Sequence, residues 1–194
     1  MKCKEDKREL IIQKGSDIMN HKGYNGTGVQ EIVDAAQIPK GSFYNYFKSK
    51  EDFAVEAIKY YSNTYYNLLE TNLKGQKMAP LERIKQIFFN IAERYEKSET
   101  TCGCFIGNMC QEMANVNKPI AEAVDDAYEH FKAPITQCLR QAQRNGDLNP
   151  SRDIDKLSEF IFNSWEGALM RMKASKSMKP LTAFHDILSE ILAG

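Results

Sequence analysis

The sequence predicts an all-helical protein with a small N-terminal domain and a larger helical domain after it. Apolar residues recur at helical spacing in nearly every segment of the 194 residues, and no convincing alternating strand pattern appears. Short helical segments dominate the first quarter, and a much longer helical pattern follows them. We therefore place a three-helix domain in residues 1–50 and a larger helical domain in residues 51–194, with a long helix over about 49–73 linking them.

The first expected helix covers about residues 5–21 and ends just before Gly23. Its apolar face should brace the two helices that follow. The second helix is short, and we expect Thr27 to cap it, because a threonine hydroxyl accepts from an unpaired backbone N–H near Gln30. Its buried stripe consists of four apolar residues: Val29, Ile32, Val33 and Ala36.

A third helix is expected to begin at about Lys40. Pro39 cannot continue the preceding helix but suits a helix start, since its fixed φ and missing N–H cost nothing there. Phe43 and Phe47 lie four residues apart and share an inward face. Hydrogen-bonding side chains then project elsewhere: Lys40, Ser42, Tyr44, Asn45 and Tyr46.

Two helices joined in this way are typical of the helix-turn-helix, whose second helix enters the major groove of DNA. The 26 basic residues are balanced by 26 acidic ones, so net charge does not suggest nucleic acid. The local charge does, because residues 35–50 hold three lysines and no acid.

The run from Ile38 to Glu51, with Gly23-Tyr24 and Thr27 upstream, resembles the signature of the TetR family of transcriptional regulators. The resemblance implies a regulator that binds double-stranded DNA. Lys40 suits guanine O6 and N7, and Asn45 suits adenine N6 and N7. The implied DNA-contacting set is Thr27, Gly28, Gln30, Lys40, Gly41, Ser42, Tyr44, Asn45, Tyr46 and Lys50.

Within that set, Ser42 and Tyr44 are suited to base edges or phosphates, and Tyr46 and Lys50 stand where the family holds phosphates. Three positions depart from the family pattern. Gly28 replaces a frequent Ser or Thr, Gln30 replaces a frequent Arg, and Asn45 replaces a frequent His. Losing a hydroxyl and a cation should make DNA affinity less steeply dependent on salt.

Ser49 and Asp52 resemble a capping box at the start of the linking helix. Further helices are expected over about 80–97, 104–115, 117–144, from Ser151 or Asp153 onward, and over 181–192, with a linker at 74–79. Pro134 should kink or split the helix over 117–144. The last two helices are too apolar for one chain to hide, and the family typically dimerises through them, so we expect a homodimer on a palindromic operator.

Aromatic residues and methionines of the larger domain suggest an adaptable apolar cavity, although such residues commonly form plain core. They are Tyr61, Tyr65, Phe88, Tyr95, Phe105, Met109, Met113, Tyr128, Phe131, Trp165, Met170 and Met172. A small-molecule effector is the expected occupant. The alternative in this region is a purely non-covalent apolar ligand with inert cysteines.

The run Cys102-Gly103-Cys104-Phe105, with Cys110 after it, falls at an expected helix N-terminus, which favours a reactive thiolate. With Trp165 to Ala168 and Lys173, it resembles a TetR subgroup that senses electrophiles or oxidants through a cysteine. The resemblance puts Cys104 at the sensor position and Lys173 at a nearby amine. The expected effector and sensor set is Cys104, Lys173, Cys102, Phe105, Asn108, Met109, Tyr128 and Trp165.

Other classes of function find little support. The three histidines have no ligand spacing to the cysteines, so we expect no metal, and no nucleotide-binding glycine motif or nucleophile with its base indicates a cofactor or an enzyme. A helical enzyme acting on a small electrophile and a regulator held off DNA by a protein partner stay open. No signal peptide or membrane span is evident, and the five cysteines suggest free thiols in a cytoplasmic protein.

Overall fold

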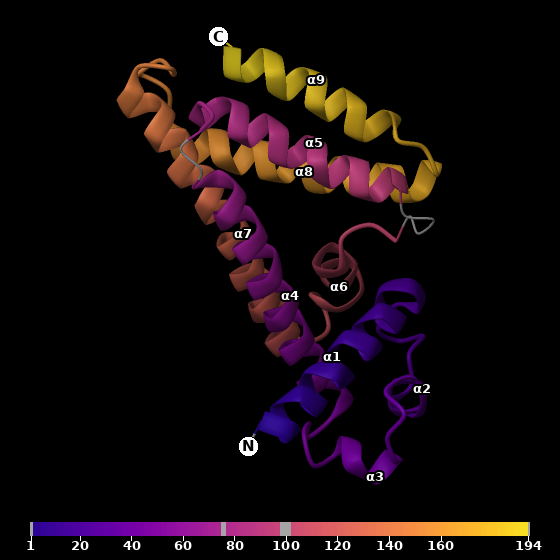
Figure 1. Ribbon diagram of the computed structural model, residues 1–194. Helices are drawn as coiled ribbons and strands as arrows, with labels where there is room; N and C mark the ends of the chain where they lie inside the picture. The colour runs from indigo at the N-terminus through magenta and orange to yellow at the C-terminus, as the bar shows by residue number, and fades with distance from the viewer. Residues whose placement is uncertain (1, 75–76, 98–101, 194) are drawn as a thin grey trace. The chain divides into compact units, whose positions relative to one another are not determined.

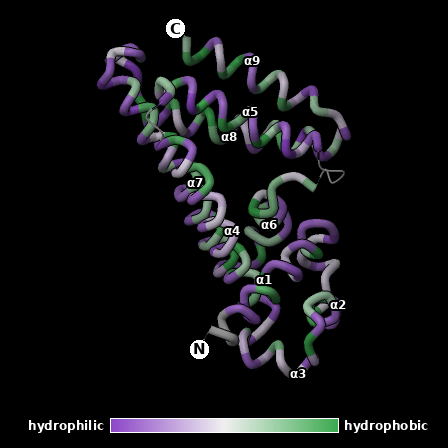
Figure 2. Tube along the Cα trace, in the orientation of Figure 1, coloured by the Kyte–Doolittle hydropathy of each residue, from purple (hydrophilic) through white to green (hydrophobic). Residues whose placement is uncertain are grey.

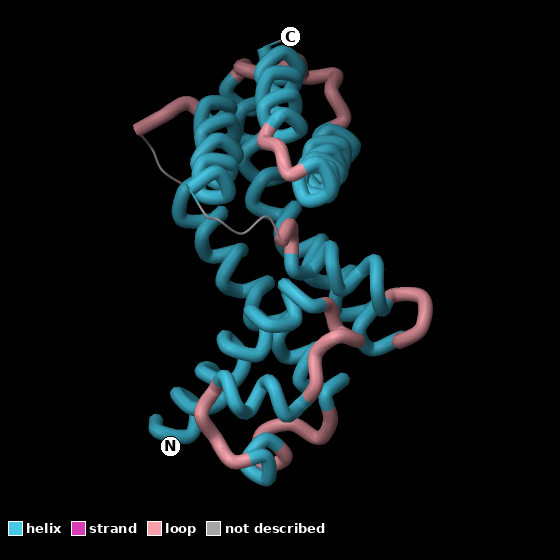
Figure 3. The backbone as a smooth tube through the Cα atoms, turned by 90° about the vertical axis from the view of Figure 1, so that its right-hand side faces the viewer, coloured by secondary structure: helices cyan, strands magenta, loops and turns pink. Residues whose placement is uncertain are grey.

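The computed structural model describes residues 2–74, 77–97 and 102–193, and within them the only regular elements are helices (Figure 3). Two residues of the expected linker, Gly75 and Gln76, lie outside the described residues. The helices are α1 (Lys2–Lys22), α2 (Val29–Ala35), α3 (Lys40–Phe43), α4 (Lys50–Leu73), α5 (Pro80–Lys97), α6 (Phe105–Met113), α7 (Lys118–Asn145), α8 (Ile154–Ser175) and α9 (Lys179–Ala193). The all-helical prediction is confirmed.

The chain forms two compact units, and each contains segments that are far apart in sequence. The first unit is Met1–Asn63 with Cys104–Ala127, and the second is Thr64–Gly103 with Tyr128–Gly194. Helices α4 and α7 therefore each contribute residues to both units. This differs from the division expected at residue 50, because α6 and the start of α7 belong with the N-terminal helices.

Polar side chains explain why α6 and α7 join the first unit. The Asn108 side-chain amide of α6 donates to Asn20 Oδ1 of α1 at 2.8 Å. The Asn117 amide, just before α7, donates to the carboxylate of Glu51 on α4. Sequence periodicity gives the length of each helix but does not contain such contacts.

In the first unit, α1 lies very close to its neighbours at Gly15. A Cβ atom added at Gly15 would lie 2.6 Å from Phe53 Cζ and 2.7 Å from Ile32 Cγ2. Both of those side chains are fully buried. The missing side chain at position 15 is therefore what allows α1 to approach α2 and α4 (Figure 1).

The expected cap of α2 is wrong. Gly28, not Thr27, occupies the N-cap position, and the Thr27 hydroxyl donates to Gly23 O at 2.8 Å instead. Thr27 is only 1% exposed, so its hydroxyl closes the turn after α1 rather than the start of α2. At the start of α2, the Glu31 carboxylate accepts from the Gly28 N–H at 3.0 Å, as the third helical residue does in a capping box.

Other helix ends follow the sequence closely. Ser49 Oγ accepts from the Asp52 N–H at 3.0 Å, and the Asp153 carboxylate accepts from the Lys156 N–H at 3.1 Å at the start of α8. Gly146, with φ of +85°, follows the end of α7. Pro134 does not split α7, which is one continuous helix from Lys118 to Asn145.

In the second unit, α5, α8 and α9 lie side by side (Figures 1 and 3). An aromatic cluster joins them, since the ring of Trp165 lies 5.0 Å from Phe88 and 5.2 Å from Phe184, and those two are 5.0 Å apart. Hydrophobic and hydrophilic residues alternate along α9 (Figure 2), as expected for a helix with one buried face.

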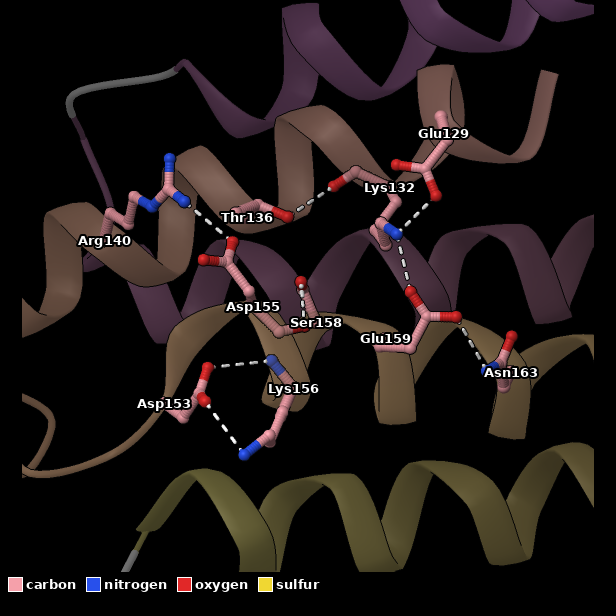
Figure 4. Close-up of polar contacts among 10 residues, drawn as sticks. All are labelled: Glu129, Lys132, Thr136, Arg140, Asp153, Asp155, Lys156, Ser158, Glu159 and Asn163. Carbon is pink, nitrogen blue, oxygen red and sulfur yellow. Dashed lines mark hydrogen bonds and ion pairs between the residues drawn. The ribbon is translucent and has the colours of Figure 1, made fainter. Parts of the chain in front are cut away.

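Ion pairs join α7 to α8 in the same unit (Figure 4). The Lys132 ammonium donates to Glu129 at 2.6 Å and to Glu159 at 2.5 Å, and Arg140 pairs with Asp155 at 2.7 Å. Burial opposes the charge on Lys132, but the hydrogen bonds to the two carboxylates raise its pKa above the ordinary value. The Lys132 contacts thus fix one register between the two helices.

Candidate functional sites

The expected recognition segment begins with α3, a helix of four residues whose N-cap is Pro39. Phe43 is fully buried and Phe47 is 1% exposed, which confirms the predicted inward face. Their rings are 5.2 Å apart, and both contact the ring of Phe53 from α4, at 5.8 Å and 5.1 Å. This aromatic cluster fixes the segment to the rest of the first unit.

The predicted DNA-contacting side chains of this segment lie mainly on its outside. Lys40, Gly41 and Asn45 are exposed, Tyr44 is 55% exposed, and Ser42 and Tyr46 are half-buried. A Cβ atom added at Gly41 would meet nothing within 4 Å, so the protein itself does not require a glycine there. The outer face therefore carries hydrogen-bond donors beside a position without a side chain.

Two predicted DNA-contacting residues on either side of the recognition segment, Gln30 and Lys50, have partners within the protein. Gln30 donates to Asp34 at 2.7 Å. The Lys50 ammonium donates to the carbonyl oxygens of Tyr24 and Thr27, both at 3.0 Å, and lies 4.1 Å from the centroid of the Tyr24 ring. Lys50 therefore supports the turn between α1 and α2.

Glu112 of α6 also holds this turn, although the sequence did not point to it. Its carboxylate accepts from the backbone N–H groups of Tyr24 and Asn25. The only sequence signal is its spacing, because Glu112 lies four residues after Asn108 and hence on the same face of the helix.

Part of the expected effector and sensor set lies in the first unit. Cys104 is the N-cap of α6, and its Sγ accepts from the Gly107 N–H at 3.5 Å. Phe105 is 4% exposed and packs on the Tyr61 ring at 4.8 Å, and Met109 is fully buried. Cys104, Phe105, Asn108 and Met109 are thus brought together by one helix.

The other four expected residues, Cys102, Tyr128, Trp165 and Lys173, lie in the second unit. Gly103 has φ of +75°, and a Cβ atom there would lie 3.4 Å from Lys173 Cδ. Burial raises the pKa of the Cys102 thiol, although the charges of Lys173 and Lys176 oppose that shift. The raised pKa favours the neutral thiol of Cys102 over its thiolate.

Trp165 is buried at 2% exposure, and its indole N–H has no hydrogen-bond partner among the described residues. Tyr128 packs edge-on against Phe162 at 5.4 Å. Met170, which we expected among the cavity residues, is instead 50% exposed, because it lies on the outer side of α8.

Within the described residues no group of His, Cys, Asp or Glu side chains could hold a metal ion. The cysteines whose side chains are described carry no disulfide bond: Cys102, Cys104, Cys110 and Cys138. The search for membrane-spanning helices, over the same residues, finds none of sufficient length and hydrophobicity.

Two parts of this chain match known protein families. Residues 9–57 match the family described as bacterial regulatory proteins, tetR family, and residues 80–188 match the tetracyclin repressor-like C-terminal domain. The chain is 30% identical over 185 residues to the HTH-type transcriptional repressor DhaR of Mycobacterium sp. (strain GP1), covering 95% of this chain and 91% of DhaR. It is 35% identical over 177 residues to the transcriptional regulator AcuR of Cereibacter sphaeroides, and the match covers 91% of this chain and 80% of AcuR.

A solved structure of Escherichia coli NemR in its reduced form is also similar, with a TM-score of 0.89 and 25% identity over 95% of this chain and 96% of that one. This similarity agrees with the resemblance to the cysteine-bearing subgroup. An all-helical fold, an outward-facing recognition segment and matches to both family domains lead to one conclusion: this chain belongs to the TetR family of DNA-binding transcriptional regulators.

Proposed function

We propose that the protein is a homodimeric repressor that binds a palindromic operator and leaves it when Cys104 is modified. The outward side chains of the recognition segment, residues 40–47, carry the DNA-binding part of this proposal, since Phe43 and Phe47 occupy the core and turn the donors away from it. Lys40 and Asn45 read base edges, Ser42 and Tyr44 add base or phosphate contacts, and Tyr46 holds a phosphate. Gly28 and Gln30, at the start of α2, contact a phosphate of the operator.

Thr27 and Lys50 contribute to this interface by ordering the turn before α2. The hydroxyl of Thr27 and the ammonium of Lys50 are both engaged with backbone carbonyls. Their loss would misplace α2 rather than remove a base contact. Gly41 allows the backbone of α3 to approach the DNA closely.

Dimerisation is supported by an apolar groove of about 290 Å³ between α8 and α9. Phe160 and Ile187 line it and are 54% and 50% exposed. Exposed apolar side chains gathered in this way are typical of a surface that a second subunit covers. Two recognition segments about 34 Å apart would then meet successive major grooves of one palindrome.

The position of Cys104 carries the sensor part of the proposal. Its sulfur caps the N-terminus of α6, where the helix dipole favours the thiolate. With N-ethylmaleimide, the thiolate sulfur bonds to an alkene carbon, the π bond breaks, and the neighbouring carbon takes a proton from water. The added group cannot occupy the cap position, so α6 must shift. By the resemblance to the cysteine-bearing subgroup, Lys173 takes the place of an amine that favours the thiolate.

A gel shift on DNA from upstream of the protein's own gene tests this proposal. Untreated protein should bind, and N-ethylmaleimide or hypochlorite should weaken binding by about 5- to 150-fold, the usual range of allosteric coupling. The Cys104→Ser variant should bind equally well and should not respond. Cys110→Ser, on the same helix, is the matched control and should respond normally. Release that persists in Cys104→Ser would overturn the sensor role.

A non-covalent effector is the second candidate, and the unpaired indole N–H of Trp165 favours it. A buried donor without an acceptor costs about 1–3 kcal/mol, which an effector carrying an oxygen acceptor would recover. Such an effector would release both wild-type protein and Cys104→Ser. A wild-type protein that neither N-ethylmaleimide nor hypochlorite releases in the gel shift above would favour this candidate.

A further inference from the structure

The turn between α1 and α2 presents two consecutive backbone N–H groups to one carboxylate. The Tyr24 N–H donates to Glu112 Oε2 at 2.7 Å, and the Asn25 N–H donates to Glu112 Oε1 at 2.6 Å. Each oxygen thus serves one amide. Hydrogen bonds to a charged acceptor are roughly twice as strong as neutral ones.

Gly23 makes this approach possible. Its φ is +79°, in the left-handed region, and a Cβ atom there would lie 2.6 Å from Glu112 Oε2. The chain thus has a residue without a side chain at the one position of the turn where a side chain would displace the carboxylate.

The same peptide units are held from α4 as well. The Lys50 ammonium donates to the carbonyl oxygens of Tyr24 and Thr27. The N–H of Tyr24 therefore donates to the Glu112 carboxylate, while its C=O accepts from the Lys50 cation. One turn earlier on α6, Asn108 donates to Asn20 near the end of α1. Helix α6 therefore holds the end of α1 and the turn after it through two side chains of one face.

We propose that Glu112 is the positioning residue through which α6 holds the helix-turn-helix in its DNA-binding geometry. A shift of α6 withdraws the carboxylate, frees the amides of Tyr24 and Asn25, and lets α2 and α3 leave that geometry. The proposal rests on the proposed function, in which Cys104 at the N-terminus of the same helix is the modified residue. All of these residues belong to the first compact unit.

Glu112→Gln is the sharpest variant, because it preserves shape and removes one acceptor. A carboxamide has a single oxygen, and its NH₂ group would face the second backbone N–H. Glu122→Gln is the matched control, since Glu122 lies in the same unit, is exposed, and contacts only Lys118 at 3.6 Å among the ion pairs of the described residues.

Two measurements on the full-length protein test the proposal. Hydrogen exchange followed by NMR should show the Tyr24 and Asn25 amides exchanging at least about tenfold faster in Glu112→Gln than in wild type or Glu122→Gln. Operator affinity without reagent should fall at least about fivefold, and N-ethylmaleimide should then change it less than about twofold. Wild-type exchange rates, or an undiminished response to N-ethylmaleimide, would overturn the role of Glu112.

The two proposals fail differently. If N-ethylmaleimide does not release the wild-type protein, the Cys104 sensor fails, while amide exchange and reagent-free affinity still test Glu112. If Glu112→Gln does not hold its circular dichroism spectrum, Glu112→Asp replaces it, because it keeps the charge but withdraws it by one methylene. Intermediate exchange at Tyr24 and Asn25 supports the role, and wild-type exchange overturns it.

Discussion

The two phenylalanines of the recognition segment decide where its polar side chains point. Phe43 and Phe47 lie in the core against Phe53, and an aromatic side chain buries about 150–250 Å². Truncating such a residue to alanine costs about 3–5 kcal/mol. Because α3 has only four residues, this anchoring, and not helix propensity, holds the segment in place.

Gly41 gives a prediction that separates folding from DNA binding. A Cβ atom at position 41 meets nothing within 4 Å, and alanine is favoured over glycine in a helix by about 1 kcal/mol. Gly41→Ala should therefore melt at the same temperature as wild type or slightly above it. Its operator affinity should fall at least about tenfold if the DNA backbone lies against this position.

Thermal melting and a binding titration measure the two effects. Gly167, on α8, also has open space around a Cβ atom, so Gly167→Ala is the control. Full DNA affinity in Gly41→Ala would show that the DNA does not approach this residue.

Side-chain direction at single residues was the least predictable level. The sequence correctly placed Phe43 and Phe47 inward, because their spacing of four residues is a strong helical signal. It gave no means to see that the Thr27 hydroxyl turns back to Gly23 O, or that Lys50 spans two carbonyls from 23 and 26 residues away. Those directions depend on the packing of α4 against the turn.

At the scale of elements, Glu56 helps to join α1 to α4. Its carboxylate accepts from Lys59 at 3.0 Å and also pairs with Arg8 of α1. Partial burial raises the pKa of Glu56, but the hydrogen bonds from Lys59 and Arg8 outweigh it and hold the pKa below the ordinary value of 4.5.

This shift predicts a dependence of stability on pH. The folded-state pKa is the lower one, so the contribution is fully present above the unfolded pKa and disappears as pH falls through the folded pKa. In urea denaturation, the free energy of unfolding should fall less between about pH 6 and about pH 3 in Glu56→Gln than in wild type. Equal losses in the two proteins would contradict this role, and the exposed Glu122→Gln should behave as wild type.

Helix boundaries were largely predictable because capping chemistry is local. Asn117 accepts from the Ile120 N–H at 3.0 Å and Asp153 caps α8, both as expected from short polar side chains before an apolar run. The membership of α6 in the first unit was not predictable. It depends on Asn108 and Glu112 meeting partners 88 residues away, and no local pattern specifies such a contact.

At the scale of the whole molecule, the groove between α8 and α9 predicts how subunit assembly supports DNA binding. Ile187→Lys places a charge on a side chain that is 50% exposed and lines the groove, so it should spare the fold but prevent pairing. Analytical ultracentrifugation should then give a single subunit, and operator affinity should fall by at least about a hundredfold because one recognition segment remains.

Val116→Lys is the matched control, because Val116 is 75% exposed but lies in the first unit. It should leave both assembly and DNA binding unchanged. A dimeric Ile187→Lys variant would place the subunit contact elsewhere.

The close approach at Gly15 has a consequence for how this protein can change over generations. Positions 15, 32 and 53 share one small volume, in which a single methyl group would collide with Ile32 and Phe53 at once. Relatives with alanine at the first position should therefore carry a smaller residue at one of the other two, and a library that randomises all three should recover folded variants only in such matched combinations.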